Sequence, residues 1–173
     1  MTAGANAIAR PLGAQLSVVG ACALGLLVAR LASRGIHVPG HAALPALFFL
    51  VYAAKRVPRT GAAGATALPT IAASLLGFAG DAGGAATLLA IAGVVEAAAF
   101  LAPGFATRLV PCLIVGLVAG AARIATQAIP LALGQPDLGA PALASALGYA
   151  LFGALGAALV PAVDSLRARR RAS

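Results

Sequence analysis

The feature that most constrains this chain is a succession of apolar segments, each about as long as a membrane-spanning helix and separated from the next by a short polar turn. A spanning helix needs about 20 predominantly apolar residues. The chain has 173 residues, of which 61% are hydrophobic and 9% are charged. Soluble domains are about 45–50% apolar and about 25% charged. We therefore predict a single integral membrane domain over residues 1–173, an all-α bundle with room for about six transmembrane helices.

Turn residues and charges divide the chain into six predicted spans. Gly35, Pro39 and Gly40 form a turn around the start of the second span, and Asp81 with its neighbouring glycines separates the third from the fourth. The second span has the shortest unbroken apolar core, and its start is placed at either Ile36 or Ala42. Pro45 lies inside a span, which membrane helices tolerate. The predicted spans are residues 12–32, 36–54, 62–80, 85–101, 107–128 and 142–163.

Positive charge is distributed unevenly between the two sides that six spans create. Of the 12 Lys and Arg residues, nine fall on the side that holds both termini and three on the other. Cytoplasmic loops carry an excess of Lys and Arg. We therefore predict that both termini are cytoplasmic and that the protein is a multi-pass protein of the inner (cytoplasmic) membrane. The nine are Arg10, Lys55, Arg56, Arg59, Arg108, Arg167, Arg169, Arg170 and Arg171, and the three are Arg30, Arg34 and Arg123.

Small residues recur at every fourth position along the first predicted span. They are Ser17, Ala21, Gly25 and Ala29. Such a stripe lets another helix approach closely in lipid, which predicts a partner-packing face. The alternative is that a chain this rich in alanine produces such stripes by chance.

Polar residues that the charge rule does not explain gather on the predicted outer side. An outward-opening, basic pocket would suit a ligand with a carboxylate, because Arg pairs with that group through two hydrogen bonds. In the alternative reading, Arg30 and Arg34 reach lipid headgroups and the two histidines are loop residues. The outer set comprises Arg30, Arg34, His37, His41, Asp81, Arg123, Gln127, Gln135 and Asp137.

Glu96 and Arg123 are ionisable residues within otherwise apolar sequence. Such residues usually face a bundle interior or a cavity, because a charge at the bilayer centre costs about 3 kcal/mol. Glu96 is about 13 residues from the outer end of its span, so a direct pair with Arg123 needs tilt or an unwound helix. Two roles stay open for Glu96: ligand binding, or hydrogen bonding to backbone and hydroxyl groups.

Motifs of catalysis and nucleotide binding are absent. The chain has no Gly-rich loop ending in Lys-Ser or Lys-Thr, no HExxH and no GxSxG. We therefore predict neither enzyme activity nor a resident cofactor. The net charge of +8 follows from cytoplasmic loops and a tail that contacts membrane lipid, so nucleic acid is not an expected partner.

In length, span number, cytoplasmic ends and the small-residue stripe of its first helix, the chain resembles the substrate-binding S components of energy-coupling factor (ECF) transporters, a type of ABC transporter. The resemblance implies that Ser17, Ala21, Gly25 and Ala29 face a transmembrane coupling subunit. It also implies two ATPase subunits as further partners, which accounts for the missing nucleotide motif. The cargo would be a vitamin or similar micronutrient, bound from outside by the outer ends of the later helices and the loops. The predicted substrate-binding residues are Arg34, His37, His41, Asp81, Glu96, Arg123 and Gln127.

Two other interpretations are open at this point. His37 and His41 leave a haem or metal-ion cargo possible, with the metal ligands undetermined. A non-catalytic scaffold or assembly subunit, whose small-residue helices only pack against partners, is the rival class. The sequence does not identify a substrate.

Overall fold

The computed structural model describes residues 11–36, 38–57, 61–132 and 140–172, with only the backbone of 127–132, 140–143 and 172. The described residues form an all-helical bundle of six α-helices, which confirms the predicted all-α class. The predicted first span coincides with α1 at both ends. The helices are α1 (Leu12–Ala32), α2 (Ala43–Arg56), α3 (Ala62–Leu75), α4 (Ala82–Leu101), α5 (Leu109–Ala132) and α6 (Ala140–Ala172).

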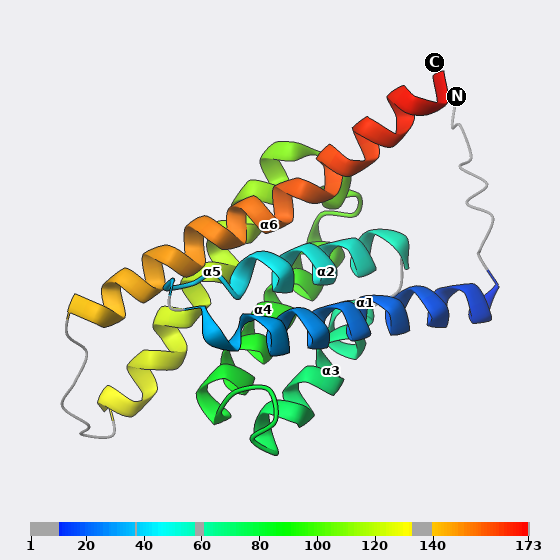
Figure 1. Cartoon of the computed structure of the whole chain (residues 1–173). Coiled ribbons are helices and arrows are strands. Elements are labelled where there is room, and N and C mark those ends of the chain that lie inside the picture. The colour runs from blue at the N-terminus through cyan, green and yellow to red at the C-terminus, as the bar shows by residue number, and fades with distance from the viewer. Residues whose placement is uncertain (1–10, 37, 58–60, 133–139, 173) are drawn as a thin grey trace.

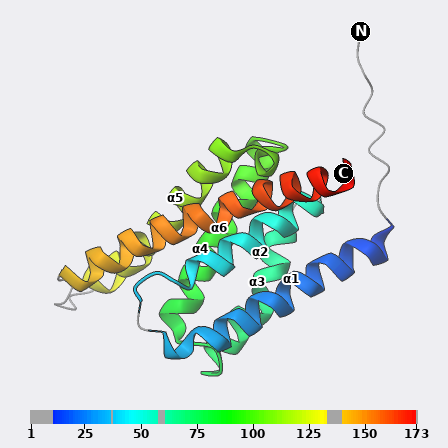
Figure 2. The same ribbon diagram turned by 45° about the horizontal axis from the view of Figure 1, so that its top comes forward.

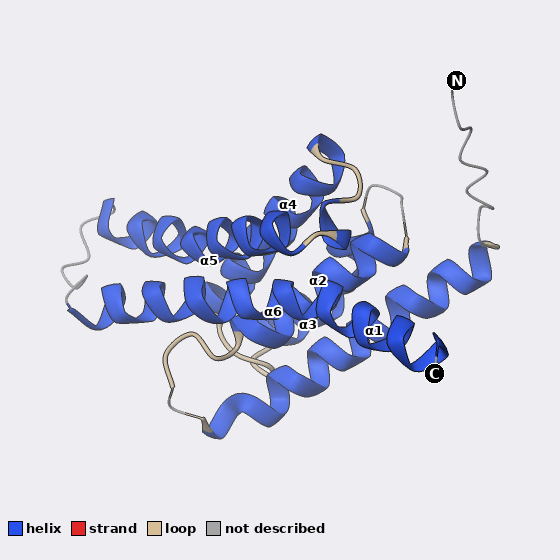
Figure 3. Ribbon diagram, turned by 90° about the horizontal axis from the view of Figure 1, so that it is seen from above, coloured by secondary structure: helices blue, strands red, loops and turns tan. Residues whose placement is uncertain are grey.

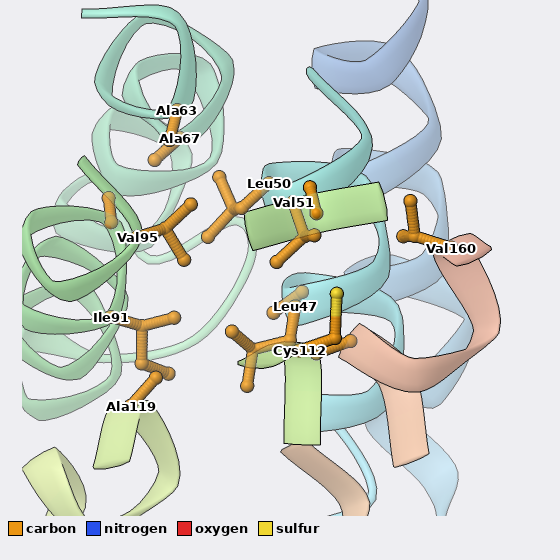
Figure 4. Packing of buried hydrophobic residues seen from close by; sticks show 14 of the residues in the cluster. Leu47, Leu50, Val51, Ala63, Ala67, Ile91, Val95, Cys112, Ala119 and Val160 are labelled. Carbon is orange, nitrogen blue, oxygen red and sulfur yellow. The ribbon is translucent and has the colours of Figure 1, made fainter. Parts of the chain in front are cut away.

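Helix α2 lies at the centre of the bundle and contacts each of the other five helices. Helices α5 and α6 form a long hairpin beside it, and α1 runs past α2 and α3 on the other side (Figures 1 and 3). Leu47, Leu50 and Val51 of α2 are fully buried. They meet Ile91 of α4 and Val160 of α6 in the apolar core (Figure 4). The segment with the shortest apolar run in the sequence is therefore the one that packs most completely against protein.

Glycines allow α5 and α6 to approach closely. A Cβ atom on Gly116 would lie 2.5 Å from the Gly153 carbonyl oxygen, and one on Gly120 would overlap the Ala150 backbone. This contact is the small-xxx-small arrangement that lets helix backbones approach in a membrane. The GxxxG spacing of α5 therefore serves packing within the chain.

Four helical stretches of the described chain are long and apolar enough to cross a membrane: Leu12–Gly35, Ala82–Leu101, Leu109–Thr126 and Ala144–Arg171. Helices α2 and α3 have 14 residues each. At 1.5 Å per residue each is about 21 Å long, shorter than the roughly 30 Å hydrocarbon core. Non-helical backbone at such depth is tolerated where protein buries it or where it lines a cavity.

The predicted second and third spans, 36–54 and 62–80, are too long at one end. Helix α2 begins only at Ala43, because a 3-10 turn at Ser33–Gly35 and a turn at Gly40, with φ of 81°, come first. Helix α3 ends at Leu75, where the Phe78 N–H donates to the Ala73 carbonyl and the Gly77 N–H donates to that of Ser74. This is a Schellman motif with Gly77 in the left-handed conformation, φ 79°.

The remaining differences are extensions of α4 and α6 and a shift of α5 toward the C-terminus. Helix α4 begins at Ala82 rather than 85, since the Asp81 carboxylate accepts the Gly84 N–H as an N-cap. Helix α5 covers 109–132 instead of 107–128. Helix α6 covers 140–172 instead of 142–163, so the arginine tail is helical. The start of α1 and the end of α6 lie at the same end of the bundle (Figures 1 and 2), here called the tail end, and the opposite end is called the Arg30 end.

Candidate functional site

Arg30 and Arg34, at the last turns of α1 and the 3-10 turn after it, hold the loop between α3 and α4. The Arg30 Nε donates to the Ala79 carbonyl at 3.1 Å, and the Arg34 Nη1 donates to the Phe78 carbonyl at 3.0 Å. A Cβ on Gly84 would lie 2.6 Å from Arg30 Nη2, so only glycine lets the guanidinium lie against the start of α4. Each arginine uses part of its donor set on this loop, and the five N–H donors of a guanidinium leave others for a ligand.

A cavity of about 330 Å³ opens at the Arg30 end, where the short helices α2 and α3 leave non-helical backbone as its wall. Small-molecule pockets are typically about 300–1,000 Å³. Three side chains in its wall carry or can carry positive charge, and none of the described residues that line it is an Asp or Glu. The cavity is lined by, among others, Arg30, Arg34, His41, Ala79, Gly80 and Tyr149.

His41 is held by backbone on both of its ring nitrogens. Nδ1 lies 2.5 Å from the Val38 carbonyl oxygen, and Nε2 lies 3.2 Å from that of Ser33. Within the described part of the chain, no three His, Cys, Asp or Glu side chains group together in a way that could hold a metal ion. His37 lies outside the described residues. Through these two contacts, His41 holds together the segment between α1 and α2 that lines the cavity.

Arg123, on α5, lies behind the cavity wall rather than in it. Its Nη1 donates to Thr87 Oγ1 at 2.7 Å and to the Gly83 carbonyl at 3.4 Å. Its guanidinium carbon also lies 5.4 Å from the centre of the Tyr149 ring, a cation–π geometry. Arg123 therefore positions Tyr149 and Thr87, while the side chain of the predicted Gln127 lies outside the described residues.

Glu96 does not join the residues of the Arg30 end. Its carboxylate accepts the N–H groups of Gly61, Ala63 and Gly64 at 2.9, 2.5 and 3.1 Å. These are orphan donors of the first turn of α3, which has no cap from its own side chains. The positive end of the helix dipole also favours a carboxylate there. The sequence left two roles open for Glu96, ligand binding or hydrogen bonding to backbone and hydroxyl groups. Its contacts in the structure are hydrogen bonds to backbone.

The predicted site divides as follows. Arg34 and His41 line the cavity, and Asp81 caps α4 at the same end. Arg123 contacts Tyr149 and Thr87 beside the cavity, whereas Glu96 binds the start of α3, away from it. Three further side chains line this region and were not predicted from the sequence: Tyr149 of α6, Thr70 of α3 and Thr87 of α4. Hydroxyl groups within apolar helices were the available signal, but the contacts that join three helices are not readable from spacing.

The small-residue stripe of α1 is split between lipid-facing and packed positions. Ser17 and Ala21 are exposed, and the Ser17 hydroxyl donates to the Ala14 carbonyl of its own helix at 3.0 Å. Gly25 instead lies against the ring of Phe49, and Ala29 is half-buried. The half of the stripe toward the start of α1 is thus the part left open to a partner.

The tail end gathers ion pairs. Asp164 of α6 pairs with Lys55 and Arg56 at the end of α2. Arg167 donates to the Tyr52 hydroxyl at 3.4 Å. These contacts place the basic end of α2 and the basic tail of α6 on one side of the bundle, as the predicted topology requires.

Comparison with protein families, with curated proteins and with solved structures finds no match for this chain. A fold class hosts many functions, whereas a site has specific chemistry. The cavity at the Arg30 end is therefore the feature from which a function can be inferred.

Proposed function

We propose that this chain is the substrate-binding membrane subunit of an ECF-type importer, and that it captures a small, carboxylate-bearing micronutrient in the cavity at the Arg30 end. The observation that carries the proposal is the lining of that cavity by Arg30 and Arg34, with no acidic side chain among the described residues of its wall. Guanidinium groups bind carboxylates in a bidentate, oriented way. A cavity of about 330 Å³ admits a vitamin-sized molecule.

The charge distribution supports entry from outside. Lys55, Arg56, Arg108 and the tail arginines lie toward the other end of the helices from Arg30, Arg34 and Arg123. With the more basic end in the cytoplasm, the cavity opens on the outer face of the inner membrane. Such a location suits capture of a scarce nutrient rather than its export.

Energy would come from other chains. Since this sequence carries no nucleotide-binding loop, the proposal requires a transmembrane coupling subunit and two ATPase subunits. The exposed half of the α1 stripe, around Ser17 and Ala21, is the face offered to the coupling subunit. A Cβ on Gly13 or Gly20 of the same helix meets no other atom within 4 Å, so this face has room for a neighbouring helix.

Native mass spectrometry of the protein gently extracted from its own membrane tests the proposal. We expect wild type to carry a small molecule, to co-purify with coupling and ATPase subunits, or both. Arg30→Gln should lose the small molecule, because the amide keeps a donor for the Ala79 carbonyl but not the charge or the paired N–H groups. Arg108→Gln, at the tail end, is the matched control and should retain it.

Two results would contradict the proposal. One is a bare wild-type chain, or one held only by membrane subunits of an unrelated complex, which is the outcome a scaffold predicts. The other is equal retention of the small molecule by Arg30→Gln and Arg108→Gln. If the bound species were a haem or a metal ion, the protein would be an uptake subunit for that cargo and not for a carboxylate.

A further inference from the structure

A second, much smaller chamber lies behind the cavity at the Arg30 end. It has a volume of about 20 Å³, enough for one water-sized group. Arg30, Ala42 and Tyr149 line both spaces, so the chamber adjoins the cavity and these three residues stand between the two. Leu26, Leu88 and Ile91 contribute apolar wall.

One side chain in this chamber has an unused hydrogen-bonding group. Thr70 of α3 is 0% exposed, and its hydroxyl oxygen has no hydrogen-bond partner among the residues that the structure describes. The two other fully or almost fully buried threonines differ: Thr66 donates to the Ala62 carbonyl and Thr87 to that of Gly83, each one turn back in its own helix at 2.8 Å. A buried polar group without a partner is unusual in a native structure and calls for an explanation.

The other fully or almost fully buried polar side chains of the chamber, Ser74 and Thr87, already have partners. Ser74 Oγ donates to the Ala79 carbonyl at 3.3 Å. Thr87 Oγ1 receives the Arg123 N–H. Arg30 and Tyr149 are only half-buried, and Arg30 Nε is bound to the α3–α4 loop. Among the described residues, Thr70 is therefore the fully buried group of the chamber whose hydroxyl is open as both donor and acceptor.

We propose that the inner chamber is the specificity subsite of the substrate site, where Thr70 hydrogen-bonds a second, compact polar group of a ligand whose carboxylate lies at Arg30. The substrate class is thus a small carboxylate that also carries a hydroxyl- or amine-sized group at its other end. The size of the chamber excludes anything larger at that position. This inference rests on the proposed function and narrows its substrate.

Binding of benzoate, 3-hydroxybenzoate and 4-hydroxybenzoate to the purified, detergent-solubilised protein tests the subsite. The three probes share one carboxylate and differ in the presence and position of one hydroxyl. We expect at least one hydroxylated probe to bind wild type about tenfold more tightly than benzoate, by isothermal titration calorimetry.

Three variants assign that difference to Thr70. Thr70→Val keeps the shape but removes the hydroxyl, and should abolish the preference while leaving benzoate affinity unchanged. Thr70→Ser should restore it. Thr66→Val, one turn away on the same buried helix face but outside the chamber, should leave the preference intact.

Equal affinity of wild type for the three probes would overturn the subsite and indicate that a water molecule fills the chamber. A preference that survives in Thr70→Val would also overturn it. Failure of all three probes to bind would reject this substrate class, whereas the proposed importer function would still be decided separately by the native mass of the extracted protein and its partners.

Discussion

At the scale of single residues, the two ionisable groups within apolar sequence have different tasks. Arg123 holds Tyr149 and Thr87 beside the cavity, and Glu96 serves the start of α3 near the tail end. Their isolation among apolar residues predicts burial and partners. Both have hydrogen-bond partners, but both are only half-buried. The isolation does not say which partners, because those come from helices that are distant in sequence.

Replacing Glu96 tests its capping role. Glu96→Ala should lower the free energy of unfolding by about 1–3 kcal/mol, since three N–H groups of α3 lose their acceptor in a setting poor in water. Hydrogen exchange followed by mass spectrometry should show faster exchange in the first turn of α3 and little change in α6. Glu96→Gln, which keeps one acceptor oxygen, should have a smaller effect. Unchanged exchange in Glu96→Ala would show that these hydrogen bonds do not fix the helix start.

At the scale of elements, the sequence predicted which helices exist better than it predicted where each helix begins and ends. Apolar runs and turn residues located all six helices, and the first was correct at both ends. The end of α3 at the cavity was missed, and of the two starts given for the second span, Ala42 rather than Ile36 was close to the observed Ala43. Gly40 and Gly77 have left-handed backbone, which places helix ends inside segments that are apolar on average. The cavity exists where these helices stop short, so its position could not be predicted from hydropathy alone.

The central position of α2 could likewise not be predicted from the sequence. Its run of Leu47, Leu50 and Val51 resembles any other span, and lies in the core because small residues of α6 allow close contact. Gly148 and Gly156 of α6 lie against the backbone of Pro39 and Leu44. Such contacts depend on which glycines face which helix, and one sequence does not specify that.

Helix packing through glycine gives a prediction with an internal control. Gly120→Ala should destabilise the protein by about 1–3 kcal/mol, because the added methyl group meets the Ala150 backbone and must push α5 from α6. Gly93→Ala, in the middle of α4 with no atom within 4 Å of the added carbon, should be neutral or stabilising by up to about 1 kcal/mol. Thermal unfolding in detergent measures both. Equal effects of the two changes would mean that the α5–α6 contact is looser than its geometry indicates.

At the scale of the whole molecule, the start of α1, the end of α6 and most of the basic residues that the structure describes lie at the same end of the bundle. The start of α1 and the end of α6 share the tail end, as an even number of crossings requires (Figure 1). Ion pairs from Asp164 to Lys55 and Arg56 join α6 to α2 at that end. The geometry gives two distinct ends, and the proposal that the tail end is cytoplasmic rests on the charge excess there.

Labelling of single introduced cysteines by a membrane-impermeant maleimide tests that assignment. Gly35→Cys, an exposed position at the Arg30 end, should react on intact cells, and Ala168→Cys in the exposed tail should react only after the membrane is opened. Wild type is the control, because Cys22 and Cys112 are only 4% and 0% exposed and should stay unlabelled. Reversed labelling would place the cavity in the cytoplasm and exclude nutrient capture from outside. Labelling of both positions on intact cells would require an even number of crossings between them, which the five helices α2 to α6 do not provide if each crosses the membrane.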